Sequence, residues 1–61
     1  MKDYITVNNG MAGYYAVYMA YNREFGAHEP WQTGIGRHKT RAKAEIEARL
    51  WAEAEDVEYQ P

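Results

Sequence analysis

The sequence has no cysteine and no serine, and only two of its 61 residues are proline. Without cysteine, neither a disulfide nor a thiolate zinc site can stabilise so short a chain. The absence of serine and cysteine also removes the usual side-chain nucleophiles. Only two histidines are present, His28 and His38, and no cysteine could complete a metal shell with them. We therefore expect a protein that is not an enzyme and that binds no metal or cofactor.

Long apolar runs are missing as well. None approaches the ~18 residues of a membrane span, and the N-terminal residues do not have the layout of a signal peptide. We therefore expect no membrane contact and a cytoplasmic location. The formal net charge is −2, from 7 basic and 9 acidic residues. An acidic balance of this kind predicts no general affinity for nucleic acid.

The residues that are present predict a folded domain, since 46% of them are hydrophobic. Residues 4–7 are β-branched or aromatic and predict a strand, and the Asn9-Gly10 pair that follows predicts a turn. Residues 14–21 and 31–35 are expected to form a second and a third strand. Connections this short favour an antiparallel meander.

The second half of the chain is expected to be helical. Residues 41–56 contain no glycine, proline or valine, and Thr40 is placed to cap the helix. Val57 and Tyr59 are expected to pack back on the core or to add a short edge strand. The prediction is a single small α+β domain over residues 1–61, in which a three-stranded antiparallel β-sheet precedes one C-terminal α-helix.

The predicted helix has two apolar stripes on roughly opposite sides. One stripe consists of Ala42, Ile46, Leu50 and Ala54. The other consists of Ala44, Ala48, Trp51 and Ala52. A sheet covers only one side of a helix. Either the core wraps widely and Trp51 closes its rim, or one stripe contacts a second copy of the chain or another protein.

The predicted sheet poses a similar choice, because both of its faces carry apolar or aromatic residues. With the helix over one face, we expect the other face to expose tyrosines, with Tyr4, Tyr14 and Tyr18 as candidate contacts. Tyrosine is enriched at protein interfaces, where a rigid aromatic body meets a polar tip. The alternative is that pairs of tyrosines on neighbouring strands merely shield the open sheet.

Charge is distributed unevenly along the helix. Residues 37–43 carry four basic residues and no acidic one: Arg37, Lys39, Arg41 and Lys43. Residues 44–61 carry six acidic residues against Arg49, a net charge of −5. The helix dipole favours acids at the N-terminus and bases at the C-terminus. This helix has the opposite arrangement at both ends, which favours a role in binding.

Two binding hypotheses follow from the charges. In the first, an acidic end meets a basic surface on a partner protein; its residues are Glu53, Glu55, Asp56 and Glu58. In the second, the basic run of residues 37–43 binds phosphates while tyrosines of the sheet stack on bases.

The segments 31–37, 40–44 and 48–53 resemble small accessory proteins of phages and prophages. These are compact, acidic, cysteine-free chains, and several of them, including anti-CRISPR proteins, inhibit a host protein by stoichiometric binding. The resemblance is one of size and style, and no functional residue carries over from it. The order of three strands and a helix is also similar to the small DNA-binding domains of some phage integrases, whose sheets carry basic residues where this one carries aromatics.

The leading hypothesis is therefore a non-enzymatic protein-binding module that inhibits a host protein, such as a defence complex, in the host cytoplasm. Its expected contact residues are Tyr4, Tyr14, Tyr18, Trp51, Glu53, Glu55, Asp56 and Glu58. One alternative is a small nucleic-acid-binding domain that uses Arg37, Lys39, Arg41 and Lys43. A second alternative is a structural homodimer in which the spare stripe of the helix is buried.

Overall fold

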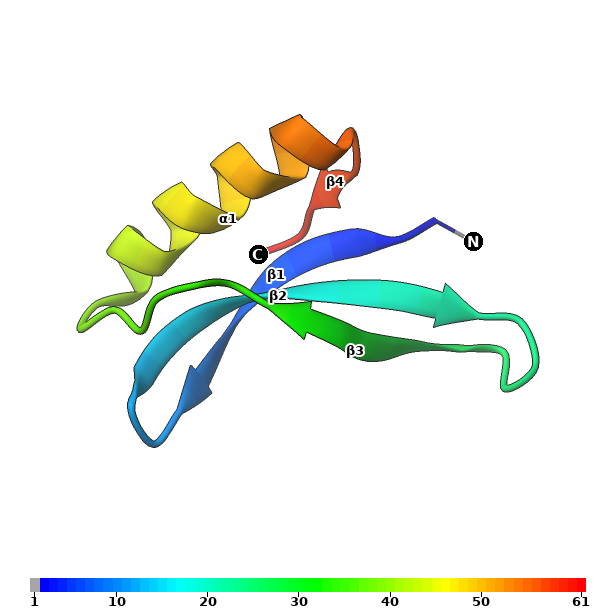
Figure 1. Cartoon of the computed structure of the whole chain (residues 1–61), viewed down its shortest axis with the longest axis horizontal. Coiled ribbons are helices and arrows are strands. Elements are labelled where there is room, and N and C mark those ends of the chain that lie inside the picture. The colour runs from blue at the N-terminus through cyan, green and yellow to red at the C-terminus, as the bar shows by residue number, and fades with distance from the viewer. Residues whose placement is uncertain (1) are drawn as a thin grey trace.

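The computed structural model describes residues 2–61 and shows an α+β fold with one helix lying over a sheet (Figure 1). In chain order the elements are β1 (Tyr4–Gly10), β2 (Gly13–Asn22), β3 (Ala27–Thr33), α1 (Arg41–Glu55) and β4 (Glu58–Tyr59). The sheet has four strands in the order β3-β2-β1-β4. The first three strands are antiparallel, and β4 runs parallel to β1. The predicted α+β class and C-terminal helix are confirmed, but the sheet is mixed and four-stranded rather than antiparallel and three-stranded.

The fourth strand exists because the chain reverses at the end of α1. Asp56 adopts the left-handed conformation (φ 56°, ψ 44°), and its N–H bonds back to the carbonyls of Ala52 and Glu53. Beyond this turn the chain runs alongside β1, and the Gln60 N–H donates to the Ile5 carbonyl at 2.9 Å. The sequence allows Val57 and Tyr59 either to pack on the core or to add an edge strand. In the structure both residues pack against the core, and Tyr59 belongs to the added strand.

The third strand begins earlier and ends earlier than the predicted 31–35. Pro30 lies within it, which the exposed position of β3 at the sheet edge permits, because an edge strand has N–H groups that need no partner. The pairing of β2 with β3 shifts between Tyr18 and Met19, and Trp31 is the extra residue on β3. The first turn also lies later than expected, at residues 11–12, with β1 extending through Gly10.

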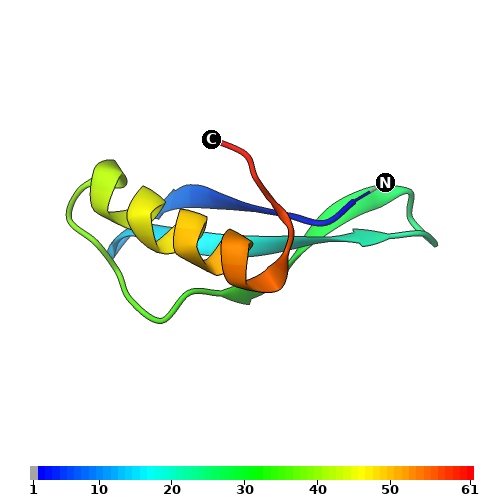
Figure 2. The same ribbon diagram turned by 90° about the horizontal axis from the view of Figure 1, so that it is seen from above.

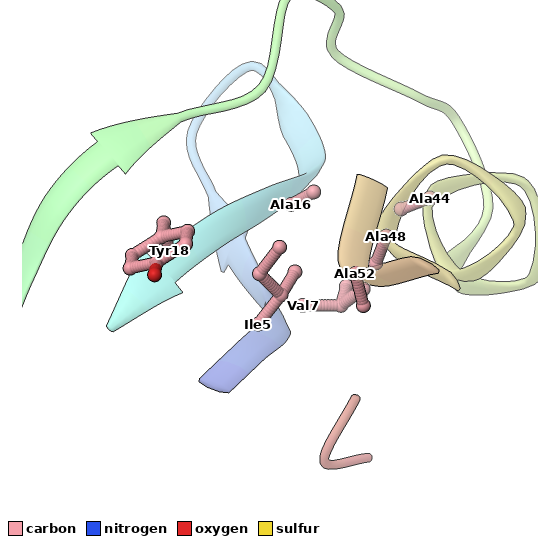
Figure 3. Packing of buried hydrophobic residues seen from close by; sticks show 7 residues of the cluster. All are labelled: Ile5, Val7, Ala16, Tyr18, Ala44, Ala48 and Ala52. Atoms are coloured by element: carbon pink, nitrogen blue, oxygen red, sulfur yellow. The ribbon is translucent and has the colours of Figure 1, made fainter. Parts of the chain in front are cut away.

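The helix packs on the sheet through alanines (Figure 3). Ala44, Ala48 and Ala52 are buried at one side of the helix and meet residues of β1 and β2. The buried cluster consists of Ile5, Val7, Ala16, Tyr18, Ala44, Ala48 and Ala52. Methyl side chains on the helix let its backbone approach the sheet closely. The structure thus decides which predicted stripe is spare: the one with Ile46 and Leu50 lies outside, with 61% and 64% of these side chains exposed.

The segment between β3 and α1 is fastened to both. Tyr14 and His38 exchange two backbone hydrogen bonds of 2.9 and 2.8 Å, and Gly13 approaches the His38 carbonyl so closely that no Cβ would fit. From the helix side, the Glu47 carboxylate accepts from the Ile35 N–H at 3.1 Å and lies 2.6 Å from the His38 ring nitrogen Nε2. Thr40 caps α1 as predicted, accepting from the Lys43 N–H at 3.3 Å.

We expect Ala48→Leu to lower the free energy of unfolding by about 1–3 kcal/mol, because the seam between helix and sheet has no room for a larger side chain. Ala42→Leu makes the same chemical change on the exposed side of α1 and should change stability by less than about 0.5 kcal/mol. Denaturant unfolding of dilute protein measures both. Equal losses in the two variants would contradict this account of the core.

Candidate functional site

The three tyrosines proposed as contacts do not share one surface. The strand register places Tyr18 opposite Ile5, on the face that α1 covers, whereas Tyr4 pairs with Met19 on the other face. Tyr14 lies on the covered face and is partly buried against the core. Tyr18 is only 8% exposed, so its prediction as an exposed contact is wrong. The physical reason is that alternation along β2 puts Tyr18 on the same face as the buried Ala16.

Tyr18 instead ties the core to the N-terminal segment. Its hydroxyl donates to Asp3 Oδ2 at 2.9 Å, and the Tyr21 N–H donates to Asp3 Oδ1 at 2.9 Å. The Tyr21 N–H, followed by the Tyr18 hydroxyl, lowers the pKa of Asp3 below its ordinary value of 3.8. The same hydrogen bond, together with burial, raises the pKa of Tyr18.

Trp31 is the prominent exposed aromatic residue on the helix side of the sheet. It packs edge-on against Tyr18, with ring centroids 5.2 Å apart, and is still 68% exposed. Trp51 of α1 flanks the same tyrosine at 6.0 Å and is half-buried. Beside Trp31 lies an open hollow of about 450 Å³ whose lining includes Ala20 and Glu29. It lies in the part of the β2–β3 hairpin that extends beyond the end of α1 (Figure 1).

Three carboxylates lie near Trp31 or Tyr18. Glu29 lines the hollow beside Trp31, Asp3 bonds to the Tyr18 hydroxyl, and Glu55 is close enough to Tyr18 to raise its pKa. We call Trp31, Trp51, Asp3, Glu29 and Glu55 the acid–aromatic surface.

Two further predicted acids lie next to this surface. Asp56 and Glu58 line a second hollow, of about 340 Å³, together with Asp3. Glu53 is exposed on α1. The structure therefore gathers Trp51, Glu55, Asp56 and Glu58 at the C-terminal end of the helix.

The sequence interpretation missed Asp3, Glu29 and Trp31 as members of this surface. Asp3 is far from the acidic end in sequence, and only the pairing of β1 with β2 brings it to Tyr18. The residue types around Trp31 predict a strand but do not indicate that its side chain is exposed. The one signal available was its position after Pro30, because a proline within a strand indicates a sheet edge.

The basic run does not form one patch. The Arg37 guanidinium lies over the Tyr15 ring, 4.4 Å from its centroid, on the sheet face away from α1. Arg41 pairs with Glu45 at 3.3 Å on the helix, and Lys39 and Lys43 are exposed. The fold thus divides the four predicted nucleic-acid contacts between the two sides of the sheet.

Among residues 2–61, no three histidine, aspartate or glutamate side chains are grouped so that they could hold a metal ion. In the same part of the chain, no helix has the length and apolar character needed to cross a membrane. Comparison of the sequence with family models and with curated proteins, and of the fold with solved structures, finds no match.

The Asp3 interactions predict a pH dependence of stability. Because the pKa of Asp3 is lower in the folded chain than its ordinary value of 3.8, its contribution is complete above that value and is lost as the pH falls through the folded pKa. Asp3→Asn should lower the melting temperature at neutral pH and make its decline below pH 3.8 shallower. Glu58→Gln, which removes a nearby carboxylate, is the control. If the melting temperature of Asp3→Asn falls with pH by as much as that of the wild type throughout the acid range, Asp3 has no such role.

Proposed function

We propose that this chain is a non-enzymatic protein-binding module that acts by stoichiometric binding through the acid–aromatic surface. The observation that carries the proposal is Trp31, a large aromatic side chain that is 68% exposed yet held against the buried Tyr18. A tryptophan fixed in this way loses little side-chain entropy when a partner covers it. Tryptophan is also enriched among the residues that dominate binding energy at protein interfaces.

The surrounding charges define the chemistry of the partner. Glu29 lies beside Trp31, Asp3 and Glu55 lie near Tyr18, which both tryptophans flank, and Asp56 and Glu58 continue the negative charge around the end of α1. A basic protein surface is complementary to this arrangement, and opposite charges increase the association rate and select the partner. The helix dipole is negative at this end, so it adds to the attraction.

The resemblance to small phage accessory proteins supports one class of partner, a host protein inhibited in the host cytoplasm. A partner that ordinarily binds nucleic acid offers the basic surface that such an inhibitor would cover.

We expect one dominant protein, at fixed stoichiometry, to be captured from a lysate of the cells that carry this sequence. Trp31→Ala should weaken that binding by at least roughly tenfold, as for other buried interface anchors. Met11→Ala removes a large exposed side chain in the distant β1–β2 turn and should leave the affinity unchanged. Isothermal titration with the captured protein measures both affinities, and melting curves verify that both variants are folded.

Charge reversal tests the acidic part of the surface separately. Glu55→Lys should weaken binding at low salt, and the loss should shrink at high salt, because added salt screens the like-charge contacts. Full affinity in both Trp31→Ala and Glu55→Lys would overturn the proposal.

A nucleic-acid-binding function is the second candidate, and the stack of Arg37 on Tyr15 favours it. The sheet face that carries this stack has no helix over it (Figure 1). The scattered positions of Lys39, Arg41 and Lys43 reduce the charge that this face can present.

We therefore expect binding to single-stranded or duplex DNA no tighter than about 1 µM at physiological salt, the range of non-specific contacts. Fluorescence anisotropy with labelled oligonucleotides measures the affinity. Tighter binding that Arg37→Ala abolishes would favour the nucleic-acid function over the protein-binding one.

A further inference from the structure

The outer side of α1 carries an apolar ridge of Ala42, Ile46, Leu50 and Ala54. All four residues are exposed, and the side chains of Ile46 and Leu50 are more than half accessible. Viewed from the helix side, no other segment of the described chain lies over α1 (Figure 2). The ridge lies on the outer side of α1, and Leu50 at its edge also lines a hollow of about 390 Å³ with Trp51. Trp31 and Glu29 line a different hollow, so a partner on the ridge would leave that part of the acid–aromatic surface accessible.

Along the helix axis, the ridge is symmetric about the level of Ala48, whose own side chain faces the sheet. If two copies of α1 pair antiparallel through their ridges and cross at this level, Ile46 of one helix lies level with Leu50 of the other, and Ala42 lies level with Ala54. A two-fold axis requires this reciprocity, because each contact between residues i and j must occur twice.

The charges beside the ridge obey the same symmetry. The crossing point set by the apolar residues brings Lys43 of one helix level with Glu53 of the other, on both sides of the axis. Both residues are exposed, and within residues 2–61 neither has an ion-pair partner. They are about 15 Å apart along their own helix, so they cannot pair within one chain. Only a second helix in the opposite direction brings these two charges together.

Antiparallel pairing also explains why the charges of α1 oppose its own dipole. The first turn has no acidic residue, and the last turn has no basic one. In an antiparallel pair, the basic N-terminal half of one helix lies beside the C-terminal end of the other, which carries both the acids and the negative end of the dipole. An arrangement that is unfavourable within one chain is thus favourable between two.

We propose that the ridge binds a second copy of this chain, through antiparallel pairing of the two α1 helices about a two-fold axis that passes between them at the level of Ala48. The sheets then lie on the outside, and the part of each acid–aromatic surface that contains Trp31 and Glu29 stays accessible. One helix face from each chain makes a small interface, so the dimer is expected to have a micromolar rather than a nanomolar dissociation constant. This inference does not depend on the proposed function.

Charge-reversal variants test the proposal by analytical ultracentrifugation from roughly 1 to 500 µM, a range that brackets the affinity of a small interface. The wild type should dimerise. Lys43→Glu alone sets two carboxylates against each other at both facing pairs, and Glu53→Lys alone sets two ammonium groups against each other at both. Each variant should weaken the dimer by at least roughly tenfold. Mixing the two single variants should restore a heterodimer, because both facing pairs then join a glutamate of one chain and a lysine of the other.

The double variant that carries both Lys43→Glu and Glu53→Lys tests the same pairing between identical chains. Each facing pair in its homodimer again joins an acid and a base, so dimerisation should return to within roughly threefold of the wild type. Net charge alone does not produce this pattern, because the two single variants change the charge of the chain in opposite directions, from −2 to −4 in Lys43→Glu (−2 − 2) and from −2 to 0 in Glu53→Lys (−2 + 2), and yet both are expected to weaken the dimer. The recovery therefore reports the pairing of the two positions across the axis.

At low concentration, both single variants should melt at or above the wild-type temperature. Lys43→Glu puts an acidic residue near the N-terminus of α1 and Glu53→Lys puts a basic residue near its C-terminus, and the helix dipole favours both. Loss of the dimer therefore cannot be ascribed to loss of the fold. Leu50→Asp should be monomeric, and Trp31→Ala should dimerise like the wild type.

A wild-type chain that stays monomeric throughout the range would overturn the dimer and leave the protein-binding proposal untouched. A dimer that survives both charge reversals, or that Leu50→Asp does not affect, would show that the copies meet on another surface and would equally overturn this pairing. A monomer whose Leu50→Asp variant loses the captured partner would assign the ridge to a different protein instead.

Discussion

The close packing of α1 on β1 and β2 is the interaction on which the rest of the structure depends. It is made by side chains no larger than a methyl group on the helix, at Ala44, Ala48 and Ala52, and these meet Ile5 and Val7 on the sheet. Because the alanines form the seam, the larger apolar residues of the helix have no place in it. Ile46 and Leu50 are left outside, and Trp51 is left at the rim. The close approach of helix and sheet therefore also explains why these larger side chains remain available for contacts outside the core.

The sheet is longer than the helix that covers it, and an aromatic cluster continues the core beyond the end of α1. Tyr18 lies at the boundary, with Trp51 on the helix side and Trp31 on the hairpin side. Its hydroxyl would be costly to bury without a partner, and Asp3 supplies one. Core and candidate site are thus continuous, because Tyr18 is a buried residue that also supports an exposed tryptophan.

The helix carries two surfaces with different chemistry on different sides. Its acidic end lies, with Asp3 and Glu29, near the cluster of Tyr18 and the two tryptophans, whereas its outer side combines an apolar ridge with charges of both signs. Each exposed charge that opposes the helix dipole costs little free energy, typically a few tenths of a kcal/mol. Both ends of α1 nevertheless carry the disfavoured sign, and the approach of a second helix in the opposite direction gives a physical reason for this. One short helix then packs on the sheet, contributes to the surface that binds a partner, and pairs with a second copy of the chain.

Local properties of the sequence were enough to predict the α+β class, the helix with its Thr40 cap, and the two apolar stripes, because propensity, capping and periodicity depend on near neighbours in the chain. They were not enough to predict which stripe is buried, since both combine alanines with large apolar residues: Ile46 and Leu50 in one, Trp51 in the other. The tertiary fold placed the alanine-rich side on the sheet, where close approach is possible. It also paired β4 with β1, turned Tyr18 into the core and brought Asp3 to its hydroxyl. Strand register decides these contacts, and register depends on partners far away in the chain.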